Sequence, residues 1–220
     1  MNPMTTTAPS LLDTALHALP LVAILRGVQP AEVAAIAQVL HEEGFRVIEV
    51  PLNSPEALRS IATLARQMPA DTLVGAGTVL SPQAVAEVQA AGGRLIVMPH
   101  ADAAVIHEAR QRGLFCVPGA ATPTEAFAAL DAGAHALKLF PAEAVTPAVL
   151  KALRAVLPPA VPLLPVGGIT PESMAVYRRA GATGFGLGSA LYSPGSTPAQ
   201  VRTRARAFVQ AWRADGPHAG

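Results

Sequence analysis

The stretches VIEVPL (47–52) and ALKLFP (136–141) decide the fold, because each resembles a strand buried on both faces yet carries a charged residue near its centre. Successive side chains of a strand point to opposite faces, so Glu49 lies opposite its two apolar neighbours. Lys138 lies opposite the two leucines beside it in the same way. If those apolar neighbours pack against helices, both charged side chains point to the inside of a curled sheet.

Six further apolar runs also resemble buried strands, so that eight such runs occur along the chain. They are LVAILRG (21–27), LVGAGTV (73–79), LIVMP (95–99), LFCVPG (114–119), LLPVGG (163–168) and GFGLGSAL (184–191). Eight βα units of roughly 25 residues, without a hairpin signal between them, predict an α/β protein with a closed (β/α)8 TIM barrel. An open doubly wound sheet is the alternative, although the first strand lacks the GxGxxG turn of that fold.

The segments between these runs contain signals for the start and end of helices. A Ser or Thr caps the first free amides and the following Pro suits the first helical position. Such pairs occur at Ser54-Pro55, Ser81-Pro82, Thr122-Pro123, Thr146-Pro147, Thr170-Pro171 and Thr197-Pro198. Glycines of the kind that favours a left-handed helix end follow five of the segments, at Gly44, Gly92, Gly113, Gly133 and Gly181.

One domain, spanning residues 10–213, is expected to hold all eight units of this 220-residue chain. Within it, residues 10–18 are predicted to form an extra N-terminal helix that covers the bottom of the barrel. Residues 1–9 are expected to be a disordered tail rather than a signal peptide, since they lack a basic region and an apolar run. Residues 214–220 are expected to be a C-terminal tail.

Composition narrows the possible partners. The net charge is +1 and no basic stretch is interleaved with aromatic residues, which argues against a nucleic-acid partner. No apolar run is long enough to span a membrane, so a cytoplasmic protein is expected. The single cysteine, Cys116, lies in an apolar run and is expected to be a buried thiol. The histidines do not have metal-ligand spacing, and neither a metal site nor a cofactor is predicted.

The two inward charges are the predicted catalytic residues. The chain has fourteen Arg but only two Lys, and a lysine, unlike an arginine, can lose its proton when buried. A neutral amine at Lys138 can attack a ketone and form a Schiff base. A carboxylate at Glu49 can then move protons beside it. The structural alternative is a buried ion pair between these groups, or between Glu49 and Arg26.

Substrate-binding residues are expected at the carboxyl ends of the strands, where barrel enzymes place their sites. Five residues are assigned there: Arg26, Asn53, Thr78, Pro99 and Phe140. Arg26 and Thr78 can hold an anionic group by charge-assisted hydrogen bonds. An ordinary ion pair at the rim and a capping hydroxyl are their alternative roles, and Asn53 has the alternative of capping the following helix together with Ser54.

Two small-residue pairs, Gly167-Gly168 and Gly188-Ser189, end the seventh and eighth predicted strands. Loops at these positions often bind phosphate through backbone N–H groups that glycine leaves uncovered. Glycine also serves tight turns, so a single pair would be a weak signal. Two pairs on adjacent strands predict a phosphate pocket.

Seven motifs together resemble the family of 2-keto-3-deoxy-6-phosphogluconate aldolases. They are AILRG (23–27), EVPLNSP (49–55), GAGTV (75–79), PG with TPTEA (118–126), LKLFPA (137–142), VGGITPE (166–172) and GLGSALY (186–192). The resemblance implies a cofactor-free homotrimer in which Lys138 forms a Schiff base and Glu49 shuttles protons. It implies that a phosphorylated 2-keto-3-deoxy sugar acid is cleaved to pyruvate and glyceraldehyde 3-phosphate.

One departure concerns the choice of substrate within that family. Gluconate-type members usually have Thr-Leu-Arg after the glutamate-valine pair, whereas this chain has Pro51-Leu52-Asn53, as galactonate-type members do. The resemblance therefore implies the galactonate epimer, with the gluconate epimer as the alternative. More distant alternatives are a barrel isomerase or synthase in which Glu49 acts without an imine, and a phosphosugar-binding barrel without catalytic activity.

Overall fold

The computed structural model describes residues 10–214, so the tail predicted at 1–9 lies outside the described residues. The tail predicted at 214–220 lies outside them as well, except for Ala214, which is the last residue of a helix. The strands are β1 (Leu21–Ile24), β2 (Val47–Pro51), β3 (Leu73–Gly77), β4 (Leu95–Val97), β5 (Phe115–Val117), β6 (Gly119–Ala120), β7 (Leu137–Leu139), β8 (Leu163–Pro165) and β9 (Phe185–Leu187). Each predicted apolar run contains a strand, and the fifth run contains two, on either side of Pro118.

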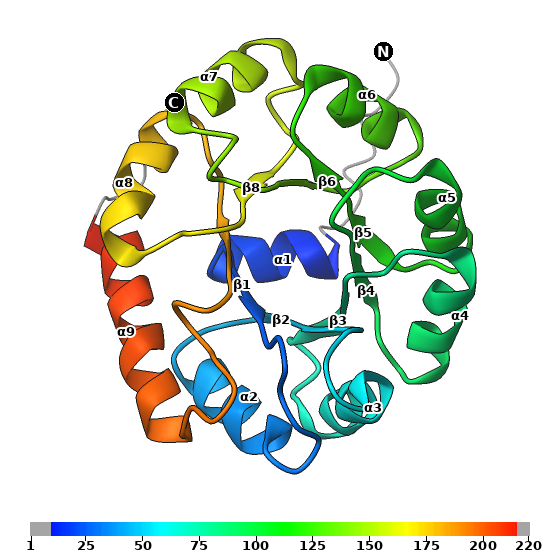
Figure 1. Cartoon of the computed structure of the whole chain (residues 1–220), viewed down its shortest axis with the longest axis vertical. Helices are drawn as coiled ribbons and strands as arrows, with labels where there is room; N and C mark the ends of the chain where they lie inside the picture. Colours follow the sequence, from blue (N-terminus) through cyan, green and yellow to red (C-terminus); the bar gives the residue numbers. More distant parts are fainter. Residues whose placement is uncertain (1–9, 215–220) are drawn as a thin grey trace, which may run out of the picture.

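The helices alternate with the strands along the chain. They are α1 (Leu11–Ala18), α2 (Val33–Glu42), α3 (Ala57–Gln67), α4 (Pro82–Ala90), α5 (Ala103–Gln111), α6 (Pro123–Asp131), α7 (Pro147–Val156), α8 (Pro171–Arg179) and α9 (Pro198–Ala214). Figure 1 shows the strands around the centre of the molecule with α2 to α9 outside them. This arrangement is an α/β fold with a curled parallel sheet.

All strand pairings in the described residues are parallel. Six strands pair in the order β5-β4-β3-β2-β1-β9, and three pair in the order β6-β7-β8. A single bridge between Val166 and Gly186 joins the end of β8 to β9. The register sets Glu49 of β2 beside Gly75 of β3, and Lys138 of β7 beside Gly119 of β6.

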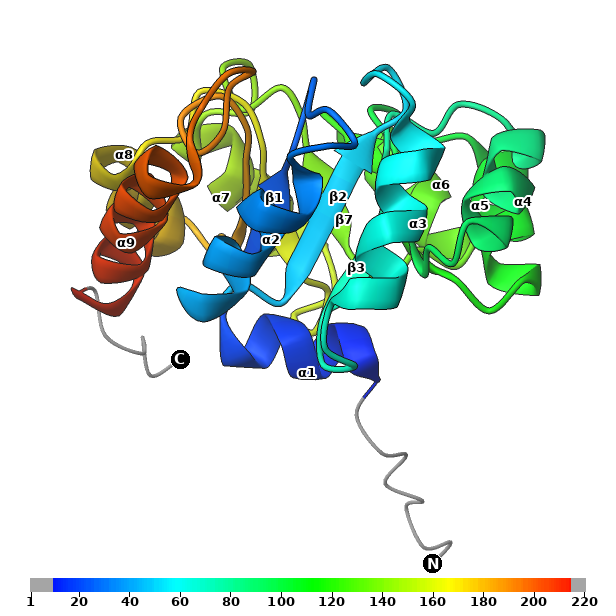
Figure 2. The same ribbon diagram turned by 90° about the horizontal axis from the view of Figure 1, so that it is seen from below.

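Two apolar cores lie on the two faces of this curled sheet. The larger core lies between strands and helices and contains Ile48, Val50, Leu137 and Leu139, the chain neighbours of Glu49 and Lys138. The smaller core is formed by strand residues of the opposite face together with two residues of α1; its members are Leu12, Ala15, Val22, Val47, Leu73, Leu95, Val97, Val117, Ala136 and Leu164. The predicted inward orientation of both charged residues is confirmed, and α1 crosses the amino-terminal ends of the strands (Figure 2).

The capping signals are correct at five of the six predicted Ser/Thr-Pro helix starts. Helices α4, α6, α7, α8 and α9 begin at the predicted prolines, and Thr122 and Glu125 form a capping box. The prediction at Ser54-Pro55 is wrong, because α3 begins only at Ala57. The N-cap position is Glu56, and the hydroxyl of Ser54 instead accepts a hydrogen bond from the backbone N–H of Gly27 at 2.9 Å.

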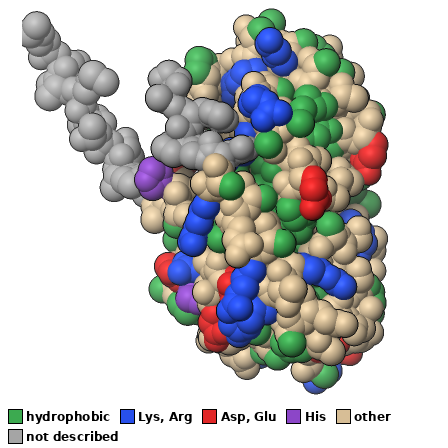
Figure 3. All heavy atoms as spheres, turned by 90° about the vertical axis from the view of Figure 1, so that its left-hand side faces the viewer, with side chains coloured by type: hydrophobic (Ala, Val, Ile, Leu, Met, Phe, Trp, Pro, Cys, Tyr) green, Lys and Arg blue, Asp and Glu red, His purple; other side chains and the backbone are tan. Residues whose placement is uncertain are grey.

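The outer face carries charges of both signs. On the face formed by α8 and α9, basic and acidic side chains are both exposed (Figure 3). Arg202 and Arg206 of α9 form ion pairs with Glu43, the residue that follows α2, and Arg202 also pairs with Glu42, the last residue of α2. In the part of the chain that the structure describes, no helix combines the length and apolar character that a membrane span requires.

Candidate active site

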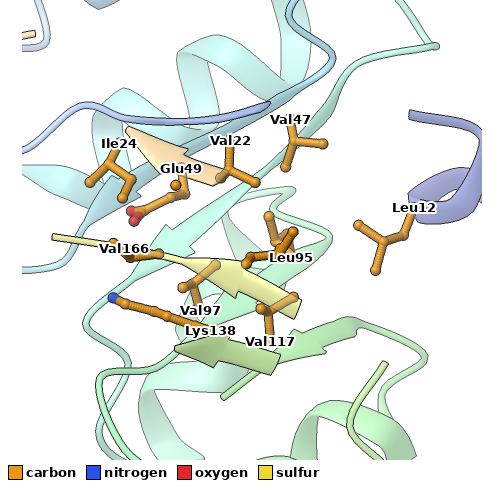
Figure 4. A pocket seen from close by; sticks show the side chains of 12 residues that line it. Leu12, Val22, Ile24, Val47, Glu49, Leu95, Val97, Val117, Lys138 and Val166 are labelled. Carbon is orange, nitrogen blue, oxygen red and sulfur yellow. The ribbon is translucent and has the colours of Figure 1, made fainter. Parts of the chain in front are cut away.

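Glu49 and Lys138 project from β2 and β7 into the interior of the curled sheet, and their polar ends lie at the same end of one cavity (Figure 4). Glu49 is 1% exposed and Lys138 is 5% exposed. The other side chains lining this cavity are apolar. Each charged group is therefore cut off from most of its hydration, and the opposite charge of the other group partly compensates for this loss.

The carboxyl of Glu49 is only partly compensated. Burial raises the pKa of Glu49 to about 7, while the charges of Lys138 and Arg26 and a hydrogen bond from the backbone of Gly77 oppose the shift. Its Oε2 atom has no hydrogen-bond partner. A Cβ atom added to Gly77 would lie 2.1 Å from that oxygen, so a glycine is required for the carboxyl to fit.

The amine of Lys138 is shifted in the opposite direction. Burial lowers the pKa of Lys138 below the usual range of a lysine, the negative charge of Glu49 opposes this, and the positive charge of Arg26 adds to it. The Nζ atom lies 4.5 Å from the centroid of the Phe140 ring. Both groups thus approach the neutral range in which an amine can attack and a carboxyl can exchange a proton.

A second, open pocket of about 390 Å³ begins at Lys138 and extends over the carboxyl ends of β1, β7, β8 and β9. Seven predicted site residues line it: Arg26, Lys138, Phe140, Gly167, Gly168, Gly188 and Ser189. Lys138 lines both the open pocket and the closed apolar cavity. Its amine therefore lies between the larger, partly polar pocket and the small apolar cavity.

The Gly167-Gly168 loop has a conformation that few residues other than glycine adopt. Its φ angles are +113° and +60°. A Cβ atom on Gly167 would also lie 2.5 Å from a carboxyl oxygen of Glu143, which packs against the loop without lining the pocket. The loop leads through Thr170 into the first turn of α8, and the positive end of this helix dipole favours an anion at this side of the pocket.

Arg26 is held by Asn53. The guanidinium of Arg26 donates a hydrogen bond to Oδ1 of Asn53 at 2.7 Å. Asn53 does not line the pocket. Its alternative role as a helix cap is excluded, because α3 begins four residues further on, at Ala57. Asn53 therefore acts on the pocket through the position of Arg26.

Thr78 and Pro99 lie next to the site but do not line either cavity. Thr78 has a φ of +55°, a strained conformation for a β-branched residue, immediately after the glycine that accommodates Glu49. The carbonyl of Pro99 would lie 2.3 Å from a Cβ on Gly119, the residue paired with Lys138. Thr78 thus follows the glycine that contacts Glu49, and Pro99 packs against the glycine that is paired with Lys138.

Two further residues of the site were not predicted to belong to it. Gly77 was part of a quoted motif, but its contact with Glu49 depends on the pairing of β2 with β3. Thr170 was predicted only as a helix cap, yet it also lines the open pocket. A Gly-Gly pair followed directly by a Thr-Pro helix start was the available signal for it. No group of three or more potential metal ligands occurs among the described residues.

This arrangement defines an amine-based enzyme of carbonyl chemistry. A lysine with a lowered pKa, a carboxyl with a raised pKa and a basic, glycine-lined pocket can together activate a ketone that carries an anionic group. Residues 12–200 match the KDPG and KHG aldolase family. The chain belongs to this family of aldolases.

Individual relatives cover nearly the whole chain. A probable 2-dehydro-3-deoxy-6-phosphogalactonate aldolase of Rhizobium meliloti is 47% identical over 89% of this chain and 92% of its own length. The 2-dehydro-3-deoxy-6-phosphogalactonate aldolase of Escherichia coli is 46% identical over 89% of this chain and 95% of its own length. A solved structure described as native KDPGal matches with a TM-score of 0.88 and 45% identity, over 90% of this chain and 96% of the solved chain.

Proposed function

We propose that this aldolase cleaves 2-dehydro-3-deoxy-6-phosphogalactonate to pyruvate and glyceraldehyde 3-phosphate through a Schiff base on Lys138. The observation that carries the proposal is the buried Lys138, which lines a basic pocket on one side and shares a small apolar cavity with the buried Glu49 on the other. The names of the two relatives at 46–47% identity support the choice of substrate.

The proposed reaction begins with the neutral amine of Lys138 attacking the C2 ketone. Loss of water gives an iminium, which accepts electrons. The carboxylate of Glu49 removes the proton of the C4 hydroxyl, the C3–C4 bond breaks, and its electron pair moves to the iminium to form an enamine. Carbon C4 leaves as the aldehyde of glyceraldehyde 3-phosphate. Protonation of the enamine at C3 and hydrolysis of the iminium release pyruvate and the free amine.

In this proposal the phosphate binds at Gly167, Gly168, Gly188 and Ser189. The first turn of α8 and the uncovered backbone of these loops favour a dianion there. Binding the phosphate fixes the far end of the substrate, which orients the reacting carbons at the amine. Arg26 and Phe140, which line the pocket, are proposed to hold the keto-acid end, and Thr78 and Pro99 are proposed to support that end from the adjacent strand ends.

Asn53 is proposed to govern the choice of C4 epimer by holding Arg26. An arginine at position 53 would place two guanidinium groups together and remove the acceptor that now fixes Arg26. The two substrates differ only in the configuration at C4, so a displaced cation near this carbon changes which hydroxyl orientation is stabilised. Loss of one charge-assisted hydrogen bond corresponds to about a tenfold to hundredfold change in preference.

The proposal also covers the closure of the barrel, the oligomeric state and the cellular location. The two sheets are proposed to act as one closed (β/α)8 TIM barrel within a single domain of residues 10–213, an inference supported by the Val166–Gly186 bridge. A homotrimer in the cytoplasm is proposed from the family resemblance. Light scattering during size-exclusion chromatography would give the mass of the assembly and contradict the trimer if it is not threefold that of the chain.

The test of the substrate is kcat/KM for both C4 epimers, measured by the pyruvate released. The galactonate epimer is expected to be cleaved better by the wild type, and Asn53→Arg is expected to shift the ratio towards the gluconate epimer by about tenfold to hundredfold. Equal or gluconate-favoured values in the wild type would overturn the epimer but not the aldolase chemistry. An unchanged ratio of the two kcat/KM values in Asn53→Arg would show that Asn53 does not determine the preference for the C4 epimer.

A further inference from the structure

The apolar cavity that ends at Glu49 and Lys138 reaches α1 at its other end. Its volume is about 20 Å³, little more than the roughly 10–15 Å³ that one water molecule requires. Figure 4 shows Leu12 at the end opposite the two charged groups, with apolar strand side chains between them. These wall residues are Val22, Ile24, Val47, Leu95, Val97, Val117, Leu164, Val166 and Gly186.

Leu12 is the residue that α1 contributes to the lining of this cavity. It is 2% exposed, whereas the next residue of the helix, Asp13, is exposed. The helix is fixed at its start by a capping box between Ser10 and Asp13. Ala15 packs in the same inner core. Leu12 thus forms a fixed apolar floor under the strands.

The closed floor matters because the upper end of the cavity holds an unpaired polar atom. Oε2 of Glu49 has no hydrogen-bond partner, so a water molecule entering from below would bind there. Such a water would stabilise the charged forms of both Glu49 and Lys138. The remaining residues that line the cavity are apolar and offer no other group that would hold that water in place.

We propose that Leu12 is a positioning residue for catalysis: by closing the floor of the cavity it excludes water from the inner side of Lys138 and Glu49, the side away from the substrate pocket, and keeps the amine nucleophilic. The reaction then depends on a helix that lies at the end of the strands opposite the substrate pocket. The proposal rests on the assignment of Lys138 as the imine-forming residue.

The charged groups near Lys138 are few, so an effect of water access on this amine can be distinguished from an effect of added or removed charge. Glu49 on β2 and Arg26 after β1 are the charged groups that act on Lys138. The wall residues contributed by β4, β5, β8 and β9 are apolar. On α1, Asp13 and His17 are both exposed at the surface. A neutral substitution of Leu12 therefore changes access of water without adding a charge.

The test uses the two lysines of the chain. Trace acetylation with acetic anhydride across a pH series, read by mass spectrometry of the Lys138 and Lys151 peptides, gives the pKa of each amine without turnover. Lys151 is exposed on α7 and serves as the internal reference. In Leu12→Asn the pKa of Lys138 is expected to rise by about one unit, a fraction of the 3–5 units that full burial can cause. Leu12→Thr is a milder variant with the same expected direction.

Two controls decide the interpretation. Leu12→Met conserves an apolar side chain of similar volume and is expected to leave the pKa of Lys138 unchanged. Leu11→Asn places the same amide at a partly buried neighbour that does not line the cavity, and it is also expected to have no effect. An unchanged pKa of Lys138 in either folded polar variant of Leu12 would overturn the proposal. An equal rise of that pKa in Leu11→Asn would overturn it as well. An unshifted pKa leaves the imine chemistry intact, because adduct formation on Lys138 tests that separately.

Discussion

The two ends of the strands differ in how their residues serve stability. At the carboxyl end lie a strained Thr78 and a buried carboxyl oxygen of Glu49 without a partner. At the amino end lie α1 and the apolar inner core, in which Leu73 and Leu95 are fully buried. The first end carries conformations and charges that cost stability, and the second supplies apolar burial that offsets them.

This difference shows where the sequence departs from the apolar pattern that a stable core requires. Glu49 and Lys138 contradict the apolar pattern of their strands, and both lie at the boundary between the two ends. Sites of this kind are expected to be functional, because a purely structural core would fill the space with apolar side chains. Substitutions at the two ends should therefore separate activity from stability.

The largest effect is expected at the amine itself. Lys138→Arg keeps the positive charge but cannot supply a neutral nucleophile, so kcat/KM should fall by about 10⁴-fold or more, as losses of other nucleophiles do. Lys151→Arg is the matched control, since this lysine is exposed on α7, and it should leave kcat/KM unchanged. Substantial cleavage by a folded Lys138→Arg protein would show that the imine is not formed there.

Glu49→Gln should lower kcat by about 10²- to 10⁴-fold, the range for loss of a general base. In the wild type, falling pH protonates Glu49 through about 7, so kcat/KM should decrease on the acid side of neutrality. This decrease of kcat/KM near pH 7 should be absent from the pH profile of Glu49→Gln. A variant that keeps this decrease would assign it to another group.

A substitution at the amino end should have the opposite profile. Leu73 is fully buried in the inner core but does not line the cavity beneath Lys138. Leu73→Ala should lower the free energy of unfolding by about 2–5 kcal/mol, as measured by denaturant titration. Its kcat should remain that of the wild type under conditions in which it is folded. A large loss of kcat with little loss of stability would break the distinction between the two ends.

A smaller effect is expected in the phosphate pocket. Gly168→Asp places a carboxylate where the phosphate is proposed to bind and beside Glu143, so KM should rise about tenfold to hundredfold while kcat changes little. Gly113→Asp is the matched control, because Gly113 also has a positive φ and a Cβ there would meet no atom within 4 Å. An unchanged KM in folded Gly168→Asp would move the phosphate site elsewhere.

Local patterns in the sequence were sufficient for the strands and for the orientation of the catalytic pair. Side-chain alternation is a property of neighbouring residues, so the inward directions of Glu49 and Lys138 could be predicted without the fold. The wrong helix start at Ser54 has a non-local cause, because its hydroxyl binds the amide of Gly27, which is 27 residues earlier. No local signal identifies that partner.

Non-local pairing also hid part of the site. The hydrogen bond from Arg26 to Asn53 spans 27 residues, and the fit of Gly77 against Glu49 depends on the register of two strands. Leu12 was expected to lie in a covering helix, but its place in the same cavity as Lys138 follows only from the way the strands curl. The chemistry of single strands was predictable, whereas contacts between them required the structure.

The central claim is that Lys138, buried at the boundary of the two ends, forms an imine with the keto acid. Incubation of the protein with pyruvate and borohydride, followed by peptide mass mapping, tests it most directly, because reduction makes the imine permanent. The chain has only two lysines, so the adduct has only two side-chain amines to occupy. The account predicts one reduced pyruvate adduct on the Lys138 peptide and none on the Lys151 peptide. An adduct on Lys151 alone, or none in the folded protein, would contradict it.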